Sequence, residues 1–420
     1  MKHHSITAAL HNRSFFFLWL AEIFSQIAMN MLNFILIIVA YELTNSNSAV
    51  SGIVLAFTIP AVIFGLLAGV YVDRWDKKKV LFATNFFRAC LLIVLAICHK
   101  NIPALYLLTF AVSTITQFFI PAETPVIPLI VQGELLYSAN ALFGIALYGA
   151  ILIAYGLSGP FLLFFQPAVS LVILGLIFFL ASVCIFFVKE PNLRKKRIAV
   201  RHLSIHEELR QAFSLILRTK EVYSSFLLLI IVQLLILIIS VLGPGYAQHV
   251  LGIGIEKFPI LFVTPAAIGL VTGSILITHY FHHYPKHRSA RLGLFIAAIA
   301  VCLLPYGSKL SSKAFIQTIN VYLPKFLMIN ILHIMVFLAF VIGIALALIF
   351  VPSNTILQEK TSDEIRGKIY GTLNAVVSLC SIIPVILAGS LADVFGVGLV
   401  LTSLGIIIGI VGVLHIFMHA

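Results

Sequence analysis

The stretch AVSGIVLAFTIPAVIFGLLAGVYVDRWDKKK, residues 49–79, decides the fold. It begins with 24 residues that carry no charge and ends in a loop with two acidic and four basic side chains. A helix needs about 20 apolar residues to cross a hydrocarbon core that is about 30 Å thick. The stretch therefore predicts one transmembrane helix followed by a loop at the membrane surface.

Eleven further apolar runs of this kind fill the chain. The twelve predicted spans are 14–42, 49–72, 80–98, 103–122, 139–163, 167–188, 223–249, 258–280, 289–307, 324–350, 368–391 and 395–417. A transmembrane barrel is excluded, because its strands would alternate apolar and polar residues over about ten positions. The sequence predicts an all-α membrane protein with twelve transmembrane helices.

The composition of the 420-residue chain supports this prediction. Hydrophobic residues make up 61% and charged residues 10%, and the mean hydropathy is +1.11. Twelve spans leave room for short loops, which argues against a soluble catalytic domain, a nucleotide-binding domain or a nucleic-acid module. The five cysteines lie in apolar runs without CxxC spacing, so we interpret them as small hydrophobic residues. We expect no metal, no cofactor and no nucleic-acid partner.

The positions of the basic residues predict the orientation in the membrane. If the N-terminus is cytoplasmic, 21 of the 27 Lys and Arg fall on the cytoplasmic side, five fall on the outer side, and Arg88 alone lies inside a span. Cytoplasmic loops carry such an excess of positive charge. We therefore expect both termini in the cytoplasm and an even number of spans.

One long hydrophilic segment divides the chain into an N-terminal six-helix half (1–188), a linker (189–222) and a C-terminal six-helix half (223–420). Its first part is basic and is expected to lie against anionic lipid headgroups. Its second part opens with a capping box, Ser204 to Glu207, and predicts an amphipathic helix. That helix lies in the membrane interface or is part of a solvated linker, and the sequence leaves both open.

The two halves share a short repeat. Phe119-Ile-Pro-Ala-Glu-Thr124 at the end of span four recurs as Phe350-Val-Pro-Ser-Asn-Thr355 at the end of span ten. The matching place in each half favours duplication over chance. Two pseudo-symmetric six-helix halves are typical of an alternating-access transporter, whose substrate site lies between them.

The loop Gly69-Val-Tyr-Val-Asp73-Arg74-Trp-Asp-Lys77-Lys78 resembles the G-x-x-x-D-R-x-x-[RK]-[RK] motif of the major facilitator superfamily. It lies between spans two and three, as it does in that superfamily. Other segments across the chain resemble the branch of siderophore exporters and macrolide-efflux proteins. In span five, Gly156-Leu-Ser-Gly159-Pro160 resembles the glycine–proline motif of antiporters, with Tyr155 in place of its first glycine. We expect a structural role for Gly159 and Pro160.

The same loop predicts a cytoplasmic gate. Gly69 lets span two approach a neighbouring helix closely, and Asp73 can accept hydrogen bonds from the open N-terminus of another helix. The resemblance implies that this helix is span eleven, which starts near Arg366. The alternative is an ordinary basic loop that only sets the orientation.

Two basic residues of the gate need an acceptor. Arg74 and Lys77 are expected to find it in Glu123, which lies at the same membrane face on span four. The corresponding loop of the second half carries Ile277 at the position that matches Asp73. That loop also holds four histidines, His279, His282, His283 and His287, which we interpret as surface residues, since no carboxylate or cysteine joins them to form a metal site.

One acidic residue lies deep in a span. Glu22 is about 12 Å into span one at 1.5 Å per residue. Gln26, Asn30 and Asn33 follow it at steps of 4, 4 and 3, so the four side chains lie within an arc of about 80° on one helix face. Such a face is not expected to point at lipid. Span one is therefore predicted to line a wet cavity.

The resemblance implies that spans one, four, seven and ten surround this cavity. Thr114 and Gln117 of span four, Gln233 of span seven, and Asn330 and His333 of span ten would then converge with the polar face of span one. Glu22 and His333 are the candidates for proton coupling. The alternative for His333 is a neutral ring bonded to a backbone carbonyl.

Arg88 lies about 13 Å into span three, which is peripheral in the superfamily. We expect it to pair inside the N-terminal half in a structural role, and a pair with Glu22 stays open.

These features predict a proton-driven exporter of an amphiphilic small molecule, such as a drug or a siderophore-like compound, that works by alternating access. The expected partners are the substrate, protons and membrane lipids, and we expect a monomer in the bacterial cytoplasmic (inner) membrane. An importer or flippase of a lipid-like solute is the alternative. A channel would need a continuous polar ring, and a membrane enzyme would need clustered ligands near one face.

Overall fold

The computed structural model of the chain describes residues 9–72, 74–123, 125–131, 135–189, 214, 216, 219–279, 285–310, 331–361 and 363–418. Every regular element in these residues is helical. The first helices are α2 (Arg13–Thr44), α3 (Asn47–Val72), α4 (Lys77–Cys98), α5 (Ile102–Glu123), α6 (Ile127–Ile130), α7 (Leu135–Phe164) and α8 (Pro167–Phe187). After them come α10 (Lys220–Gly245), three short helical segments between Tyr246 and Val263, α11 (Thr264–His279), α12 (Lys286–Leu310), α14 (Ile331–Glu359), α15 (Asp363–Phe395) and α16 (Val397–Met418).

Each predicted span contains one long helix. Eleven helices in the described residues are long and apolar enough to cross a membrane, or twelve if the bent helix α7 counts as one span. Several predicted ends differ from the observed ones, among them those of α14 and α15. Helix α14 continues to Glu359 instead of ending at 350, and α15 begins at Asp363 instead of 368. Polar residues at helix ends extend beyond the hydrocarbon, so an apolar window underestimates the helix.

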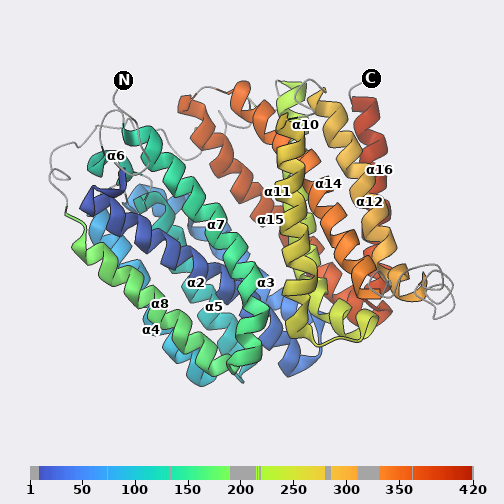
Figure 1. Cartoon of the computed structure of the whole chain (residues 1–420), viewed down its shortest axis with the longest axis horizontal. Helices are drawn as coiled ribbons and strands as arrows, with labels where there is room; N and C mark the ends of the chain where they lie inside the picture. The colour runs from blue at the N-terminus through green and yellow to red at the C-terminus, as the bar shows by residue number, and fades with distance from the viewer. Residues whose placement is uncertain are drawn as a thin grey trace, which may run out of the picture. The chain divides into compact units, whose positions relative to one another are not determined.

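The chain divides into two compact units, each of which is a bundle of helices (Figure 1). Unit 1 comprises Met1–Leu43 and Gly52–Leu203, and unit 2 comprises Thr44–Ser51 and Ser204–Ala420. The predicted linker 189–222, with the amphipathic helix that Ser204 would open, lies almost entirely outside the described residues.

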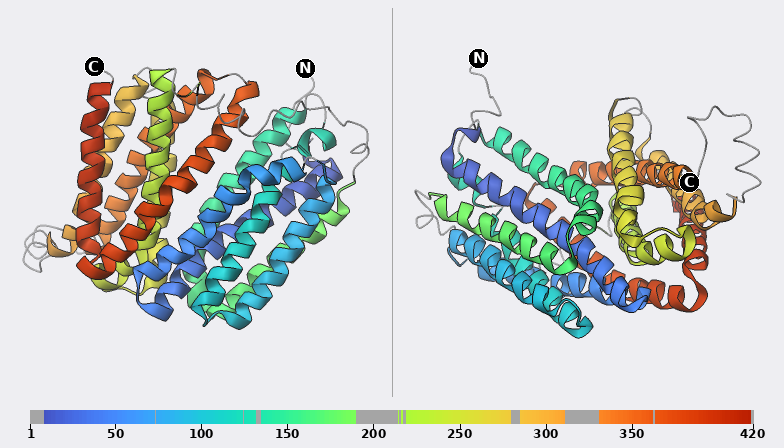
Figure 2. Two further views of the ribbon diagram at one scale, coloured as in Figure 1. Left: turned by 180° about the vertical axis from the view of Figure 1, so that it is seen from behind. Right: turned by 60° about the horizontal axis from the view of Figure 1, so that its bottom comes forward.

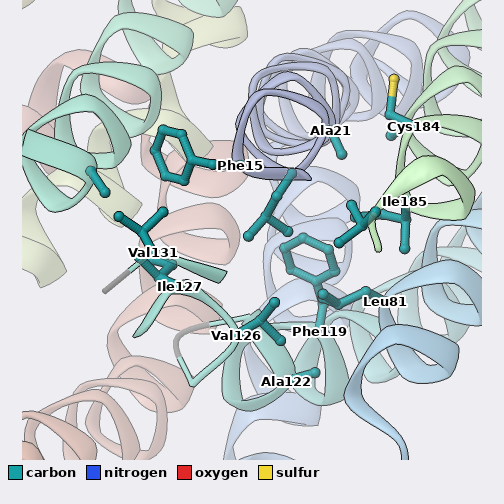
Figure 3. Close-up of a cluster of buried hydrophobic side chains, with 14 of the residues drawn as sticks. Phe15, Ala21, Leu81, Phe119, Ala122, Val126, Ile127, Val131, Cys184 and Ile185 are labelled. Atoms are coloured by element: carbon teal, nitrogen blue, oxygen red, sulfur yellow. The ribbon is translucent and has the colours of Figure 1, made fainter. Parts of the chain in front are cut away.

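An apolar cluster holds one end of unit 1 together. Helices α4 and α8 lie side by side (Figure 2), and Nζ of Lys78 at the start of α4 donates a hydrogen bond to the carbonyl oxygen of Val188 at 2.6 Å. Figure 3 shows Phe15 and Ala21 of α2 facing Phe119 and other side chains of α4, α5, α6 and α8. Because lipid tails are as apolar as these side chains, it is close van der Waals packing that holds the inner faces of the helices together.

Helix α7 bends by 48° between Ser138–Ile151 and Gly156–Phe164. The break between the two parts, at residues 152–155, ends one turn before Pro160, whose ring has no N–H to donate and clashes with the carbonyl group four residues earlier, at Gly156. Gly159 and Pro160 themselves lie in the second part of the helix.

Helices α11 and α14 approach each other closely in unit 2. A Cβ atom on Gly343 of α14 would overlap the carbonyl oxygen of Ala266, and one on Gly273 of α11 would lie 2.8 Å from the Cβ of Ala347. At Gly69 of α3, an added Cβ would meet nothing within 4 Å among the described residues. Gly273, the corresponding position in the second half, does lie at a close helix approach, and the expected approach of span eleven to Gly69 stays a prediction.

A single carboxylate anchors the link between α2 and α3 within unit 2. Asn45 of this link has a φ of 52°, in the left-handed region that Asn tolerates after a helix end. Asp393 of α15 accepts hydrogen bonds from the Oγ of Ser46 at 2.6 Å and from the backbone N–H groups of Asn47 at 2.7 Å and Ser48 at 3.0 Å. It also accepts from Nδ2 of Asn47 at 3.0 Å and Oγ of Ser48 at 2.7 Å. A carboxylate at a helix N-terminus is favourable for the open N–H groups and for the helix dipole.

We expect Asp393→Ala to release this anchor. Hydrogen bonds to a charged group are strong, but Asp393 is exposed and water replaces part of them, so we expect a local loss of about 1.4 kcal/mol, or about tenfold. Hydrogen exchange measured by mass spectrometry should show the amides of Asn47 and Ser48 exchanging about tenfold faster. Asp393→Asn keeps one oxygen acceptor and should have a smaller effect. Unchanged exchange in Asp393→Ala would show that the contact does not hold the link.

Candidate functional site

The polar residues predicted on one face of span one form a ladder along α2. Nε2 of Gln26 donates a hydrogen bond to Oε1 of Glu22 at 3.0 Å. Nδ2 of Asn30 donates to the backbone oxygen of Gln26 at 2.8 Å and lies 3.5 Å from its Oε1. The spacing of four residues brings these side chains one above the other. The ladder orients the carboxyl group of Glu22 and leaves its second oxygen for another partner.

Glu22 is buried inside unit 1, with 3% of its surface exposed. Its Oε2 atom has no hydrogen-bond donor among the described residues, and neither has the buried Oδ1 of Asn33, further along the same helix. Buried polar atoms are nearly always satisfied, so such atoms mark a place where a proton, water or ligand is expected.

Glu123 at the end of α5 is a second acidic group that acts electrostatically on Glu22. Oε1 of Glu123 is buried and, like Oε2 of Glu22, has no hydrogen-bond partner in the part of the chain that the structure describes. The helices come together there because Phe119 and Ala122 of α5 belong to the same apolar cluster as Ala21 of α2 (Figure 3).

Glu123 was expected to accept hydrogen bonds from Arg74 and Lys77 of the gate loop. Glu123 forms no ion pair with Arg74 or Lys77 in the described structure. The side chain turns toward the interior of unit 1, where α2 and α4 each contribute an ionisable group, and Arg74 stays exposed at the surface. Local sequence gave no signal for this interaction, because Glu22 and Glu123 lie on helices that are distant in the chain.

Arg88 of α4 is fully buried, with 1% of its surface exposed. Its Nη1 atom donates to Oγ of Ser25 at 3.0 Å and lies 3.4 Å from Oδ1 of Asn85. The guanidinium group lies over the rings of Phe119 at 4.8 Å and Phe178 at 5.4 Å, which are favourable cation–π contacts.

The charge of Arg88 acts on both carboxyl groups. Arg88 interacts electrostatically with Glu22 and Glu123, although no ion pair joins them in the described residues. Its Nε and Nη2 atoms have no hydrogen-bond partner there. Sequence reasoning placed Arg88 inside the N-terminal half and left a pair with Glu22 open. The structure adds Glu123 and makes the group a cluster of three.

The other predicted cavity residues are dispersed over both units. On α5, Oγ1 of Thr114 donates to the carbonyl oxygen of Phe110 at 2.8 Å, and Gln117 is half-buried and lies near Gly65 of α3. Gln233 is half-buried on α10. No described contact therefore joins these residues to Glu22.

Span ten is described in part. Asn330 lies outside the described residues. His333 lies in the first described turn of α14, and its side chain is exposed. Its expected place in the cavity stays a prediction.

The predicted gate is described in part. Asp73 lies outside the described residues, and Arg366 lies in the first turns of α15. The loop itself is ordered around Asp76, whose side chain accepts a hydrogen bond from the backbone N–H of Lys79 at 3.2 Å and caps α4.

An open groove of about 660 Å³ lies beside this loop, and the sequence did not predict it. Arg74 and Lys79 lie at its rim, and Trp75, Phe87 and Phe118 contribute to its apolar wall. The rings of Trp75 and Phe118 stack at 6.0 Å. Asp76 also lines the groove, so its charged side chains are of both signs.

No group of three metal-binding side chains occurs in the described part of the chain. Of the four predicted surface histidines, His282 and His283 lie outside it.

Comparisons with known proteins agree with this architecture. The model of the Major Facilitator Superfamily matches residues 18–322. The chain is 22% identical over 404 residues to the MFS-type transporter YfiS of Bacillus subtilis, covering 90% of this chain and 87% of that protein. It is 24% identical over 391 residues to macrolide efflux protein A of Streptococcus pyogenes, covering 91% and 90%.

Solved structures share the fold at low sequence identity. The nucleoside transporter NupG aligns with a TM-score of 0.76 at 13% identity, covering 97% of this chain and 99% of that one. A bacterial homologue of the iron transporter ferroportin, in an inward-facing state, aligns with a TM-score of 0.70 at 13% identity, covering 96% and 98%. The helix pattern, the family match over most of the chain and these relatives lead to one conclusion: the chain belongs to the major facilitator superfamily and is a multi-pass membrane transporter.

Proposed function

We propose that the chain exports an amphiphilic small molecule, of drug or siderophore-like character, in exchange for protons. The observation that carries the proposal is the buried carboxyl group of Glu22, which shares one helix face with three amide side chains. A carboxyl group in that position can hold a proton, and the amides can bind a polar group of a substrate. The similarity to macrolide efflux protein A supports export as the direction.

The mechanism is alternating access between two pseudo-symmetric six-helix halves with both termini in the cytoplasm. A proton from outside neutralises Glu22 and favours reorientation, and substrate from inside favours release of the proton. Thr114, Gln117, Gln233 and Asn330 line the cavity, and His333 is the second candidate for the proton site. The protein works as a monomer in the bacterial cytoplasmic membrane, and the basic linker contacts anionic lipids.

An accumulation experiment tests the direction. Cells with the protein should accumulate less of a labelled macrolide than cells without it, and collapse of the proton gradient should remove the difference. Higher accumulation in cells with the protein would favour the alternative, an importer or flippase of a lipid-like solute.

Cysteine labelling tests the topology. In a background without the five natural cysteines, Arg197→Cys and Ser362→Cys should be shielded from an impermeant thiol reagent in intact cells, because 21 basic residues mark that side as cytoplasmic. Ser311→Cys should be labelled. Labelling of Arg197→Cys from outside would invert the proposed orientation.

Asp73→Asn tests the gate. The variant keeps the side-chain shape and removes a charge-assisted hydrogen bond of about 1.5–3 kcal/mol, enough to shift a two-state equilibrium about tenfold or more. Transport should fall, while expression and macrolide binding to the purified protein persist. Normal turnover would leave the loop with a role in orientation alone.

Glu22→Gln tests the coupling. The variant imitates the protonated carboxyl group, so gradient-driven export should be lost while passive exchange of macrolide across proteoliposome membranes remains. The matched control is Glu221→Gln, which removes an exposed carboxylate with 54% of its side chain accessible, and it should leave export unchanged. Full gradient-driven export by Glu22→Gln would move the coupling role to His333, to be tested by the pH dependence of His333→Asn.

A further inference from the structure

The link between α2 and α3 belongs to a different unit from the helices on either side of it. Residues 44–51 fall in unit 2, whereas α2 up to Leu43 and α3 from Gly52 onward fall in unit 1. The first turn of α3, residues 47–51, is therefore packed with one unit and the rest of that helix with the other. Any contact that holds this turn acts at the point where the chain passes between the units.

Three residues at steps of four, on one face of α15, hold the first turn of α3. Asp393 is the last of them and accepts its N–H groups. The backbone oxygen of Val385 accepts a hydrogen bond from Oγ of Ser51 at 2.8 Å. Between these two lies Gly389, where an added Cβ would overlap Oγ of Ser51 and lie 2.6 Å from the backbone oxygen of Asn47. The glycine thus lets the two backbones come close enough for Asp393 to reach the start of α3.

The sequence that makes this contact repeats part of the predicted gate. Residues 387–393 and residues 67–73 both read L-A-G-x-x-x-D. Asp393 lies in the last turn of α15, and Asp73 directly follows the end of α3. Because α3 is long enough to cross the membrane, its first turn and Asp73 lie at opposite membrane faces. The repeat therefore supplies each of the two helices with an acid at its C-terminal end, one at each face.

We propose that Val385, Gly389 and Asp393 form a latch that holds the start of α3 on α15 while the transporter is closed to the outside. The proposed orientation places this end of α3 at the outer face. The proposal rests on the proposed alternating access, and it adds an outer counterpart to the predicted gate at Asp73. The latch opens when the gate closes, so the same two helices are joined at one face at a time.

The chemistry of the latch suits a contact that breaks in every cycle. Hydrogen bonds from N–H groups to a carboxylate are strong and directional. Asp393 is exposed, however, so water can replace its partners when the latch opens. The open N–H groups of Asn47 and Ser48 then face water as well, since they lie at the end of a membrane span. Release is therefore cheaper than it would be for a buried ionic contact.

Distances between spin labels in the purified full-length protein test the latch without substrate or gradient. In the cysteine-free background, Leu43→Cys and Leu399→Cys carry the labels, because both side chains are exposed and neither belongs to the latch. Double electron–electron resonance in lipid nanodiscs then reports the distance between the end of α2 and the start of α16. Opening of the latch should appear as a population with a longer distance.

Asp393→Ala removes all the hydrogen bonds to this carboxylate. The ratio of the longer to the shorter distance should rise about tenfold, as expected for the loss of a charge-assisted helix cap. Asp393→Asn keeps one oxygen acceptor and should give a smaller rise. Gly389→Ala should act in the same direction, because its Cβ pushes the first turn of α3 away. The matched control is Gly409→Ala on α16, where the added Cβ meets Cβ of Ala298 at an ordinary 3.6 Å and should change nothing.

The distances separate this proposal from the proposed function. A distribution in Asp393→Ala that equals that of wild type would overturn the latch, even if Gly389→Ala does not fold. An equal shift in Gly409→Ala would overturn it too, because any glycine substitution would then have the same effect. Failure of the wild-type protein to export macrolide, with the shift in Asp393→Ala intact, would overturn the transport proposal alone.

Discussion

A carboxyl group inside a membrane protein must be paired, and the interior of unit 1 is arranged around that requirement. Glu22 lies in an apolar cluster, where an isolated charge would cost many kcal/mol. Gln26 donates to one oxygen, the other oxygen has no partner among the described residues, and Arg88 supplies a positive charge nearby. Helices α2, α4 and α5 therefore combine apolar contact with charge compensation at this point.

The twelve spans could be predicted because apolar runs of this length have one physical explanation in a membrane. The polar ladder of α2 could be predicted because its spacing is local and helical. The ends of the helices could not be predicted, because α15 starts in a charged stretch at Asp363 and α14 continues beyond its apolar run to Glu359. The grouping of Glu22, Arg88 and Glu123 depends on how helices that are distant in the chain pack, which no local pattern encodes.

A small residue serves close helix packing in the second half. Gly273 of α11 lies against α14, where an added Cβ would lie 2.8 Å from the Cβ of Ala347. The contacts of Asp393 also could not be predicted from neighbouring residues. It is an exposed acid near the end of α15, and its partners are the hydroxyl and N–H groups of residues 46–48, far away in the sequence.

The polar face of α2 connects the proposed proton site to the proposed substrate site. Gln26 joins the two directly, because its amide donates to Glu22 at one end and its backbone oxygen accepts from Asn30 at the other. A substrate bound to that face and a proton bound to Glu22 would then bias the same helix, so their competition needs no pathway longer than two turns of α2.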